Sequence, residues 1–170
     1  MSGKVGLQSV IINALQYKQE SSGIGVLIRE LFTPFCERID WPCTVVLSKN
    51  SPDFQVKNPL VTVVRSPYGK EQNLRRLWFQ SFRLGHMARN CVLVTVDSKI
   101  PFYLSKTTQI LPIITDLAVY RHSDTYQTSR VLLWKLQFFL LRRRAERFCA
   151  ISNFTRQEII ALFHTEPNAV

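Results

Sequence analysis

The stretch SVIINALQYKQESSGIGVLIRELF, residues 9–32, decides the fold expected for this chain of 170 residues. It begins with SVIINAL (Ser9–Leu15), an apolar run of strand length, and continues through a short polar loop. From Ile24 onward, apolar residues recur at the spacing i, i+3, i+4 and i+7, which is typical of an amphipathic helix. A strand followed by a helix is the repeating unit of α/β proteins.

Apolar strands recur along the rest of the chain. After the first, the predicted strands are Cys43–Lys49, Leu60–Ser66, Cys91–Asp97, Gln109–Asp116 and Arg147–Ser152. Strands that are apolar almost throughout are buried on both faces, as in parallel sheets covered by helices. The sequence therefore predicts an α/β fold with a doubly wound, mostly parallel, Rossmann-like sheet.

Further helices are predicted between these strands. One of them is expected to bury an apolar stripe made of Leu74, Leu77, Trp78, Phe82 and Gly85. Another covers Thr128–Arg144, and a closing helix, FTRQEIIALF, is expected to be capped by Ser152 or Asn153. Each helix gives the sheet an apolar side to pack against.

The composition fits one globular domain with a core, because 46% of the residues are hydrophobic and 20% are charged. The longest apolar cluster, VLLWKLQFFLL (Val131–Leu141), is shorter than the roughly 18–20 residues that span a bilayer. The N-terminal residues lack the apolar core of a signal peptide. A cytoplasmic chain is therefore the expectation.

The cysteines and histidines give no sign of a metal centre. Neither a C-x-x-C pair nor closely spaced histidines occur. We expect buried, reduced thiols at all four cysteines, which are Cys36, Cys43, Cys91 and Cys149.

The net charge of +10 favours an anionic partner, and nucleic acid, anionic lipid headgroups and nucleotide phosphates all fit. LRRLWFQSFR (Leu74–Arg83) mixes arginines with aromatic residues, but its periodicity indicates a helix with a buried stripe and a solvated basic face. LLRRRAER (Leu140–Arg147) either meets acidic lipid headgroups or complements the negative end of its helix. Charge alone does not choose among these partners.

Candidate binding residues follow three of the predicted strands. Ligands of open parallel sheets bind beyond the carboxyl ends of the strands. The first strand leads to Gly23 and Gly25, whose lack of a Cβ lets a phosphate approach the first N–H groups of the helix. This G-x-G pattern fits a plain turn equally well, because the remaining Rossmann glycines and the P-loop lysine are missing.

The other two strands end in polar residues. Asp97 and Ser98 follow CVLVTV, and Thr115 and Asp116 follow QILPII. An aspartate at a strand end either serves a ligand or caps the next turn. Capping is favoured for Asp97, and the two interpretations are evenly balanced for Asp116.

Four stretches, in this order, resemble the N-terminal domain of GT-B-fold retaining glycosyltransferases of the large "group 1" family. They are GIGVLIREL, CVLVTVDSKIP, ILPIITDLAVYRHSDTY (Ile110–Tyr126) and RRRAERFCAISNFTRQEII (Arg142–Ile160). Together they extend over nearly the whole chain. The resemblance implies an enzyme that moves a sugar from a nucleotide-sugar donor to a polysaccharide or lipid-linked glycan acceptor, with retention of anomeric configuration.

The resemblance also implies roles for particular residues. The glycine loop of the family lies against the donor diphosphate, which assigns that role to Gly23, Ile24 and Gly25. Thr115 and Asp116 match the family's catalytic His–Asp pair, and Asp97 with Ser98 would contact the acceptor. Because threonine stands in the place of histidine, a proton-shuttling role is lost at that position. No metal or cofactor is expected, since the nucleotide-sugar is a substrate.

By the same resemblance, residues 1–163 form the acceptor-side domain and residues 164–170 begin the crossover to a donor-binding domain. Transfer would then need that second domain, in cis or in trans. Peripheral contact with the inner face of the membrane fits a lipid-linked acceptor, and nucleic acid is not expected. The alternatives are a non-catalytic α/β module that binds anionic partners through its basic surface, and an inactive, truncated remnant.

Overall fold

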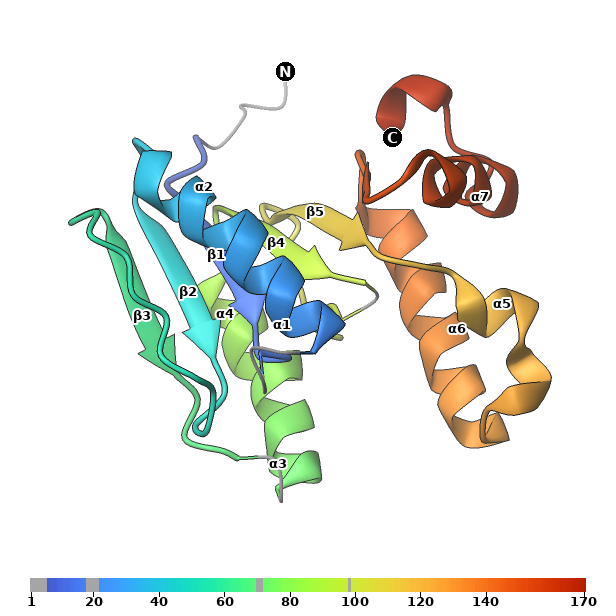
Figure 1. The fold of residues 1–170 in the computed structure, drawn as a ribbon, viewed down its shortest axis with the longest axis horizontal. Helices are drawn as coiled ribbons and strands as arrows, with labels where there is room; N and C mark the ends of the chain where they lie inside the picture. Colours follow the sequence, from blue (N-terminus) through green and yellow to red (C-terminus); the bar gives the residue numbers. More distant parts are fainter. Residues whose placement is uncertain (1–5, 18–21, 70–71, 98) are drawn as a thin grey trace. The chain divides into compact units, whose positions relative to one another are not determined.

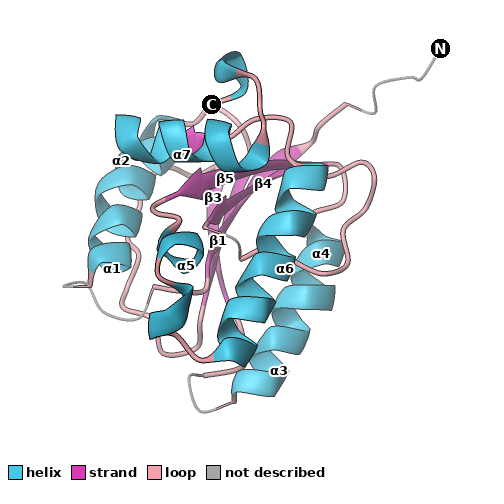
Figure 2. Cartoon of the chain, turned by 90° about the vertical axis from the view of Figure 1, so that its right-hand side faces the viewer, coloured by secondary structure: helices cyan, strands magenta, loops and turns pink. Residues whose placement is uncertain are grey.

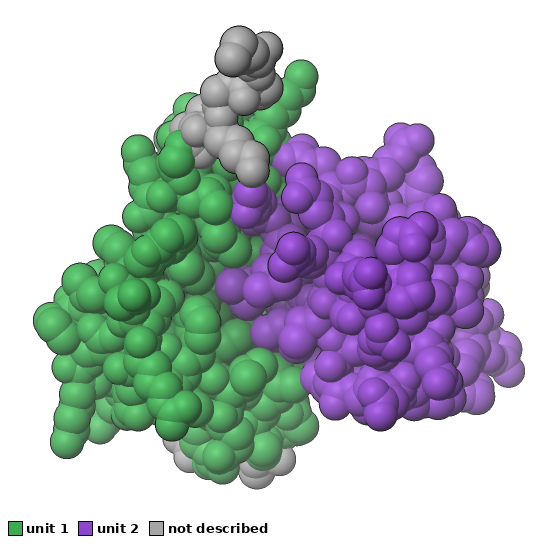
Figure 3. Space-filling view, turned by 90° about the horizontal axis from the view of Figure 1, so that it is seen from above, with its two compact units in different colours: residues 1–93, 101–108 green, residues 94–100, 109–170 purple. Residues whose placement is uncertain are grey.

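The computed structural model describes residues 6–17, 22–69, 72–97 and 99–170 (Figure 1). The chain divides into two compact units (Figure 3). Unit 1 consists of residues 1–93 and 101–108, and unit 2 consists of residues 94–100 and 109–170.

The predicted α/β fold is confirmed. Six strands form one parallel sheet in the order β3-β2-β1-β4-β5-β6. The strands are β1 (Ser9–Ala14), β2 (Cys43–Leu47), β3 (Val61–Arg65), β4 (Cys91–Val96), β5 (Gln109–Ile114) and β6 (Cys149–Ala150). The order runs outward from β1 in one direction and from β4 in the other, which is the doubly wound, Rossmann-like arrangement.

The first helix of unit 1 runs without a break through three segments: α1 (Gly23–Leu27), a π-helical turn (Ile28–Phe32) and α2 (Thr33–Arg38). Its buried residues are Gly25, Ile28, Phe32 and Cys36. A π-helical turn takes more residues than an α-helical turn, and from Ile28 onward the buried positions are four residues apart. Leu31 and Phe35, which the α-helical spacing placed on that face, are exposed.

The second helix also contains a π-helical turn, between α3 (Asn73–Trp78) and α4 (Leu84–Met87). The two helices of unit 1 lie on opposite faces of its strands (Figure 2). Phe79 and Leu84 join the core with residues of β1, β2 and β4. The predicted buried stripe is wrong for Leu74, Trp78 and Phe82, which are exposed, and correct for Gly85, which is buried.

Gly85 of α4 lies against the loop that follows β4. A Cβ at this position would overlap the carbonyl oxygen of Tyr103 and would lie 3.3 Å from Cβ of Pro101. The loop is held there by a hydrogen bond of 3.2 Å from the Tyr103 N–H to the carbonyl oxygen of Ser81. The close approach therefore requires glycine.

Unit 2 is built around β5 and its helices. These are α5 (Ala118–Arg121), α6 (Thr128–Arg144) and α7 (Asn153–Phe163), with short 3₁₀ turns at Ser123–Thr125 and Pro167–Ala169. The bounds of α6 agree with the prediction. Ser152, rather than Asn153, caps α7, because its Oγ accepts a hydrogen bond of 3.1 Å from the Thr155 N–H.

The thiol prediction is correct for three cysteines and wrong for one. Cys36, Cys43 and Cys91 are buried and reduced, whereas Cys149 is reduced but exposed. Cys149 belongs to β6, which has two residues and lies at the edge of the sheet, where no further strand covers it. Within the described residues, no helix combines the length and apolar character needed to cross a membrane.

Candidate functional site

The carboxyl ends of β4 and β5 are joined by Asp97 and Thr115. Asp97 Oδ1 accepts two hydrogen bonds from Thr115, one of 2.9 Å from its N–H and one of 2.7 Å from its hydroxyl. The Asp97 N–H donates to the carbonyl oxygen of Ile113 at 2.8 Å. Asp97 therefore links the end of β4 to β5. The sequence had favoured a different role, in which Asp97 caps the turn that follows its own strand.

The Asp97 backbone adopts φ 54°, in the left-handed region, where residues other than glycine are uncommon. Such conformations persist where the surroundings hold them, and they cluster at functional sites. Here the two hydrogen bonds from Thr115 hold the side chain.

Burial raises the pKa of the Asp97 carboxyl, because desolvation penalises its charged form. The two hydrogen bonds from Thr115 and the charge of Lys99 act in the opposite direction, and the nearby charge of Asp116 adds to the increase. The hydrogen bonds from Thr115 therefore favour the ionised form of Asp97, whereas its burial favours the protonated form.

Asp116 is exposed, directly after Thr115. Its Oδ1 accepts a hydrogen bond of 2.9 Å from the Ala118 N–H, so it stabilises the start of α5. One carboxylate oxygen thus has a capping role. A carboxylate can accept several hydrogen bonds, so this contact still leaves capacity for the hydroxyl of a ligand.

The first turn of α7 is tied to the end of β5. The Thr155 hydroxyl donates to the carbonyl oxygen of Thr115 at 3.3 Å and lies 3.0 Å from Ser152 Oγ. A hydrogen-bonded chain therefore connects Asp97, Thr115, Thr155 and Ser152. Sequence reasoning identified Ser152 as a cap but missed Thr155, whose only signal was a threonine three residues after a capping serine.

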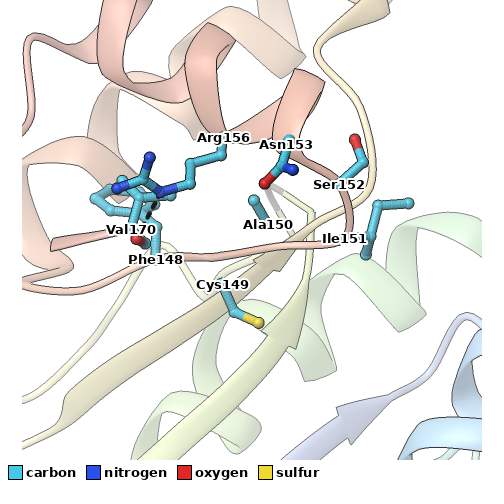
Figure 4. A pocket seen from close by; sticks show the side chains of 8 residues that line it. All are labelled: Phe148, Cys149, Ala150, Ile151, Ser152, Asn153, Arg156 and Val170. Carbon is cyan, nitrogen blue, oxygen red and sulfur yellow. Dashed lines mark hydrogen bonds between the residues drawn. The ribbon is translucent and has the colours of Figure 1, made fainter. Parts of the chain in front are cut away.

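A hollow of about 520 Å³ lies beside the start of α7 (Figure 4). Its lining consists of Phe148, Cys149, Ala150, Ile151, Ser152, Asn153, Arg156 and Val170. The guanidinium group of Arg156 donates to the carbonyl oxygens of Val170 at 3.1 Å and Pro167 at 2.6 Å. The only cationic side chain of the hollow is therefore committed to neighbouring backbone, and the sequence did not predict this hollow.

In unit 1, Ser22 opens the helix that contains the glycine turn. Its Oγ accepts a hydrogen bond of 3.0 Å from the Gly25 N–H, and Gly23 and Ile24 come between them. No described glycine has a positive φ, so the turn does not need glycine for its backbone conformation. A Cβ at Gly23 would meet nothing within 4 Å, which leaves open space above the first turn.

The predicted site residues thus form two groups, each within one unit. Gly23, Ile24 and Gly25 belong to unit 1, while the structure brings Asp97 and Thr115 into contact in unit 2, with Asp116 next to them. Ser98 lies outside the described residues. Among the described residues, no group of three or more histidine, cysteine, aspartate or glutamate side chains is placed to hold a metal ion.

No protein-family model matches this chain, and no curated protein matches it.

Proposed function

We propose that this chain is the acceptor-side domain of a retaining glycosyltransferase, which moves a sugar from a nucleotide-sugar donor to a polysaccharide or lipid-linked glycan. The observation that carries the proposal is the placement of Asp97, Thr115 and Asp116 at the carboxyl ends of adjacent strands of a Rossmann-like sheet. Ligands of such sheets bind at this edge. The four stretches that resemble the family give the second line of support.

In this proposal, the acceptor is held by unit 2. The exposed Asp116 carboxylate accepts a hydrogen bond from an acceptor hydroxyl. The Thr115 hydroxyl proton is committed to Asp97, so Thr115 offers only the lone pairs of its oxygen to a ligand. Because a threonine hydroxyl does not titrate near neutral pH, Thr115 orients the acceptor and does not act as a base. Asp97 keeps Thr115 in place.

The glycine turn of unit 1 contributes to the donor side. The first N–H groups of a helix have no partner within the helix. Ser22 already engages the N–H of Gly25, which leaves the N–H groups of Gly23 and Ile24 for the donor diphosphate. Backbone N–H groups stabilise the negative charge that grows on a leaving diphosphate. Most of the donor would be held by a second domain, in cis or in trans.

The donor side is tested by titrating the ¹⁵N-labelled chain with uridine diphosphate and guanosine diphosphate. We expect amide shifts at Gly23 and Ile24, with weak binding. The variant Gly23→Ala adds a Cβ where the protein leaves space, so it should keep its stability but weaken diphosphate binding several-fold. If Gly23→Ala binds the diphosphates as strongly as the parent chain does, the glycine turn is not part of the donor site.

The acceptor side is tested by transfer. The chain is combined with the donor-binding domain of a retaining glycosyltransferase, and transfer of labelled sugar to a lipid-linked glycan is measured. Asp116→Asn should lower the rate at least about tenfold, the cost of one charge-assisted hydrogen bond. Asp124→Asn, at another exposed carboxylate of unit 2, is the control. Equal rates for both variants would reject the role of Asp116.

Of the alternatives, the binding module for anionic partners is the one that the charge of +10 favours. Binding of a random oligonucleotide that falls steeply with salt, together with no transfer in the combined protein, would support that module instead.

A further inference from the structure

The outer side of the second helix of unit 1 carries an exposed apolar stripe. Leu74 is 83%, Trp78 52% and Phe82 50% exposed, although the sequence pattern predicted that all three are buried. They recur every four residues, so they share one side of the helix. The rings of Trp78 and Phe82 lie against each other, with centroids 5.9 Å apart. The opposite side supplies Phe79 and Leu84 to the core, whereas Leu74, Trp78 and Phe82 do not belong to that buried cluster.

Cationic side chains flank this stripe. Arg75 and Arg83 are exposed on the same helix. This helix, from Asn73 to Met87, contains no aspartate or glutamate, and its arginine, tryptophan and phenylalanine side chains are Arg75, Arg76, Trp78, Phe79, Phe82 and Arg83. The surface formed by Leu74, Arg75, Trp78, Phe82 and Arg83, which we call the Trp78 face, is therefore both apolar and positively charged.

We propose that the Trp78 face docks on the surface of an anionic lipid bilayer. A helix that lies in a membrane interface inserts its apolar side at the boundary between headgroups and acyl chains, while arginine reaches the phosphates. Tryptophan is enriched at this boundary. Each arginine adds attraction to anionic lipid. The face offers these three kinds of side chain within three turns of one helix.

Charge argues against two other occupants. A second copy of the same face would bring Arg75 and Arg83 of both chains together, and no acidic side chain of this helix would compensate them. Nucleic acid would satisfy the arginines and could stack on Trp78, but it offers no apolar environment for Leu74, the most exposed residue of the stripe. An anionic bilayer offers acyl chains to the apolar residues of the Trp78 face and lipid phosphates to its two arginines.

The inference goes beyond the proposed function and does not require it, because docking is measured without sugar transfer. Vesicles of equal parts phosphatidylcholine and phosphatidylglycerol are compared with vesicles of phosphatidylcholine alone in a flotation assay. We expect binding to the anionic vesicles that weakens as salt is added. The double variant Trp78→Ser/Phe82→Ser should lower partitioning by roughly tenfold for each ring removed.

Two controls keep the test specific. Trp41→Ser removes an exposed tryptophan that follows Asp40 outside the Trp78 face, and it should bind vesicles as the parent chain does. The double variant should still unfold cooperatively in urea, because Phe79 and Leu84, which this helix supplies to the core, are unchanged.

Fluorescence gives an independent measure of insertion. In Trp41→Phe/Trp134→Phe, only Trp78 remains, and vesicles with brominated acyl chains should quench it. In Trp78→Phe/Trp134→Phe, only Trp41 remains, and it should stay unquenched. The proposal is overturned if Trp78 is not quenched, if the double variant binds as tightly as the parent, or if the chain binds a random oligonucleotide but not the anionic vesicles.

Discussion

Replacing Thr115 with valine removes one hydrogen bond and keeps nearly the same side-chain shape. The hydroxyl that donates to Asp97 Oδ1 at 2.7 Å is lost, while the N–H that donates to the same oxygen at 2.9 Å remains. A hydrogen bond to a charged group contributes about 1.5–3 kcal/mol. Because both residues are only partly buried, we expect a loss near the lower end, about 1.5 kcal/mol of unfolding free energy at neutral pH.

The loss should depend on pH in a definite direction. Burial raises the pKa of Asp97 in the folded chain above its ordinary value of 3.8. An acid with a raised folded pKa binds its proton more tightly when folded, so its contribution to stability falls as pH rises from 3.8 through the folded pKa. Thr115→Val should raise that pKa further. Thr115→Val should therefore cost its full unfolding free energy above the folded pKa of Asp97, where the carboxyl is ionised. It should cost less below the ordinary pKa of 3.8, where the carboxyl is protonated.

Urea unfolding near pH 7 and near pH 3.5, together with a ¹³C NMR titration of the Asp97 carboxyl, measures both effects. Thr115→Ser keeps the hydroxyl and is the matched control for the pKa. In Asp97→Asn, the additional change Thr115→Val should cost less than it does in the parent chain. An equal cost at both pH values, or an unchanged pKa of Asp97, would refute the assigned role of the hydroxyl.

Three further predictions concern the two units. Gly85→Ala should lower the unfolding free energy by about 1–3 kcal/mol, as overpacking does, whereas Gly23→Ala should stay within about 0.5 kcal/mol of the parent in urea unfolding. Arg121→Met removes the 2.8 Å ion pair to Glu158, a carboxylate whose side chain is only 12% exposed. It should cost about 1 kcal/mol at neutral pH, and adding Glu158→Gln should recover part of that loss; no recovery would mean that the ion pair contributes nothing. A thiol reagent should modify one cysteine of the native chain quickly, Cys149, and the other three only after unfolding, as peptide mass mapping can check.

The fold could be predicted from the sequence because its signals are local. Buried parallel strands are apolar almost throughout, and helices between them show their own periodicity. The bounds of Thr128–Arg144 agree with the structure for this reason. The strand β6 was predicted as Arg147–Ser152 but contains only Cys149–Ala150, which pair with Ile113 and Ile114 of β5. Because β5 ends at Ile114, the pairing stops there, and the sequence of β6 alone does not show where its neighbour ends.

The site could be predicted only in part. Asp97, Thr115 and Asp116 were identified from their position after apolar strands, and the motifs that resemble the glycosyltransferase family gave them roles that remain predictions. The hydrogen bonds between Asp97 and Thr115 could not be predicted, since they join residues 18 positions apart through the pairing of neighbouring strands. The contact from Thr155 to the Thr115 carbonyl oxygen joins residues 40 positions apart.

The sequence by itself determined the alternation of strands and helices, and with it the doubly wound parallel sheet. The reason is that the apolar pattern within a strand or helix shows which of its sides is buried. Only the tertiary structure decided which side of the helix at Asn73–Met87 is buried. Its π-helical turn rotates the later residues relative to the earlier ones, so a regular helical period assigned Trp78 and Phe82 to the core. Packing against the sheet instead selected Phe79 and Leu84 and left an aromatic, basic surface exposed.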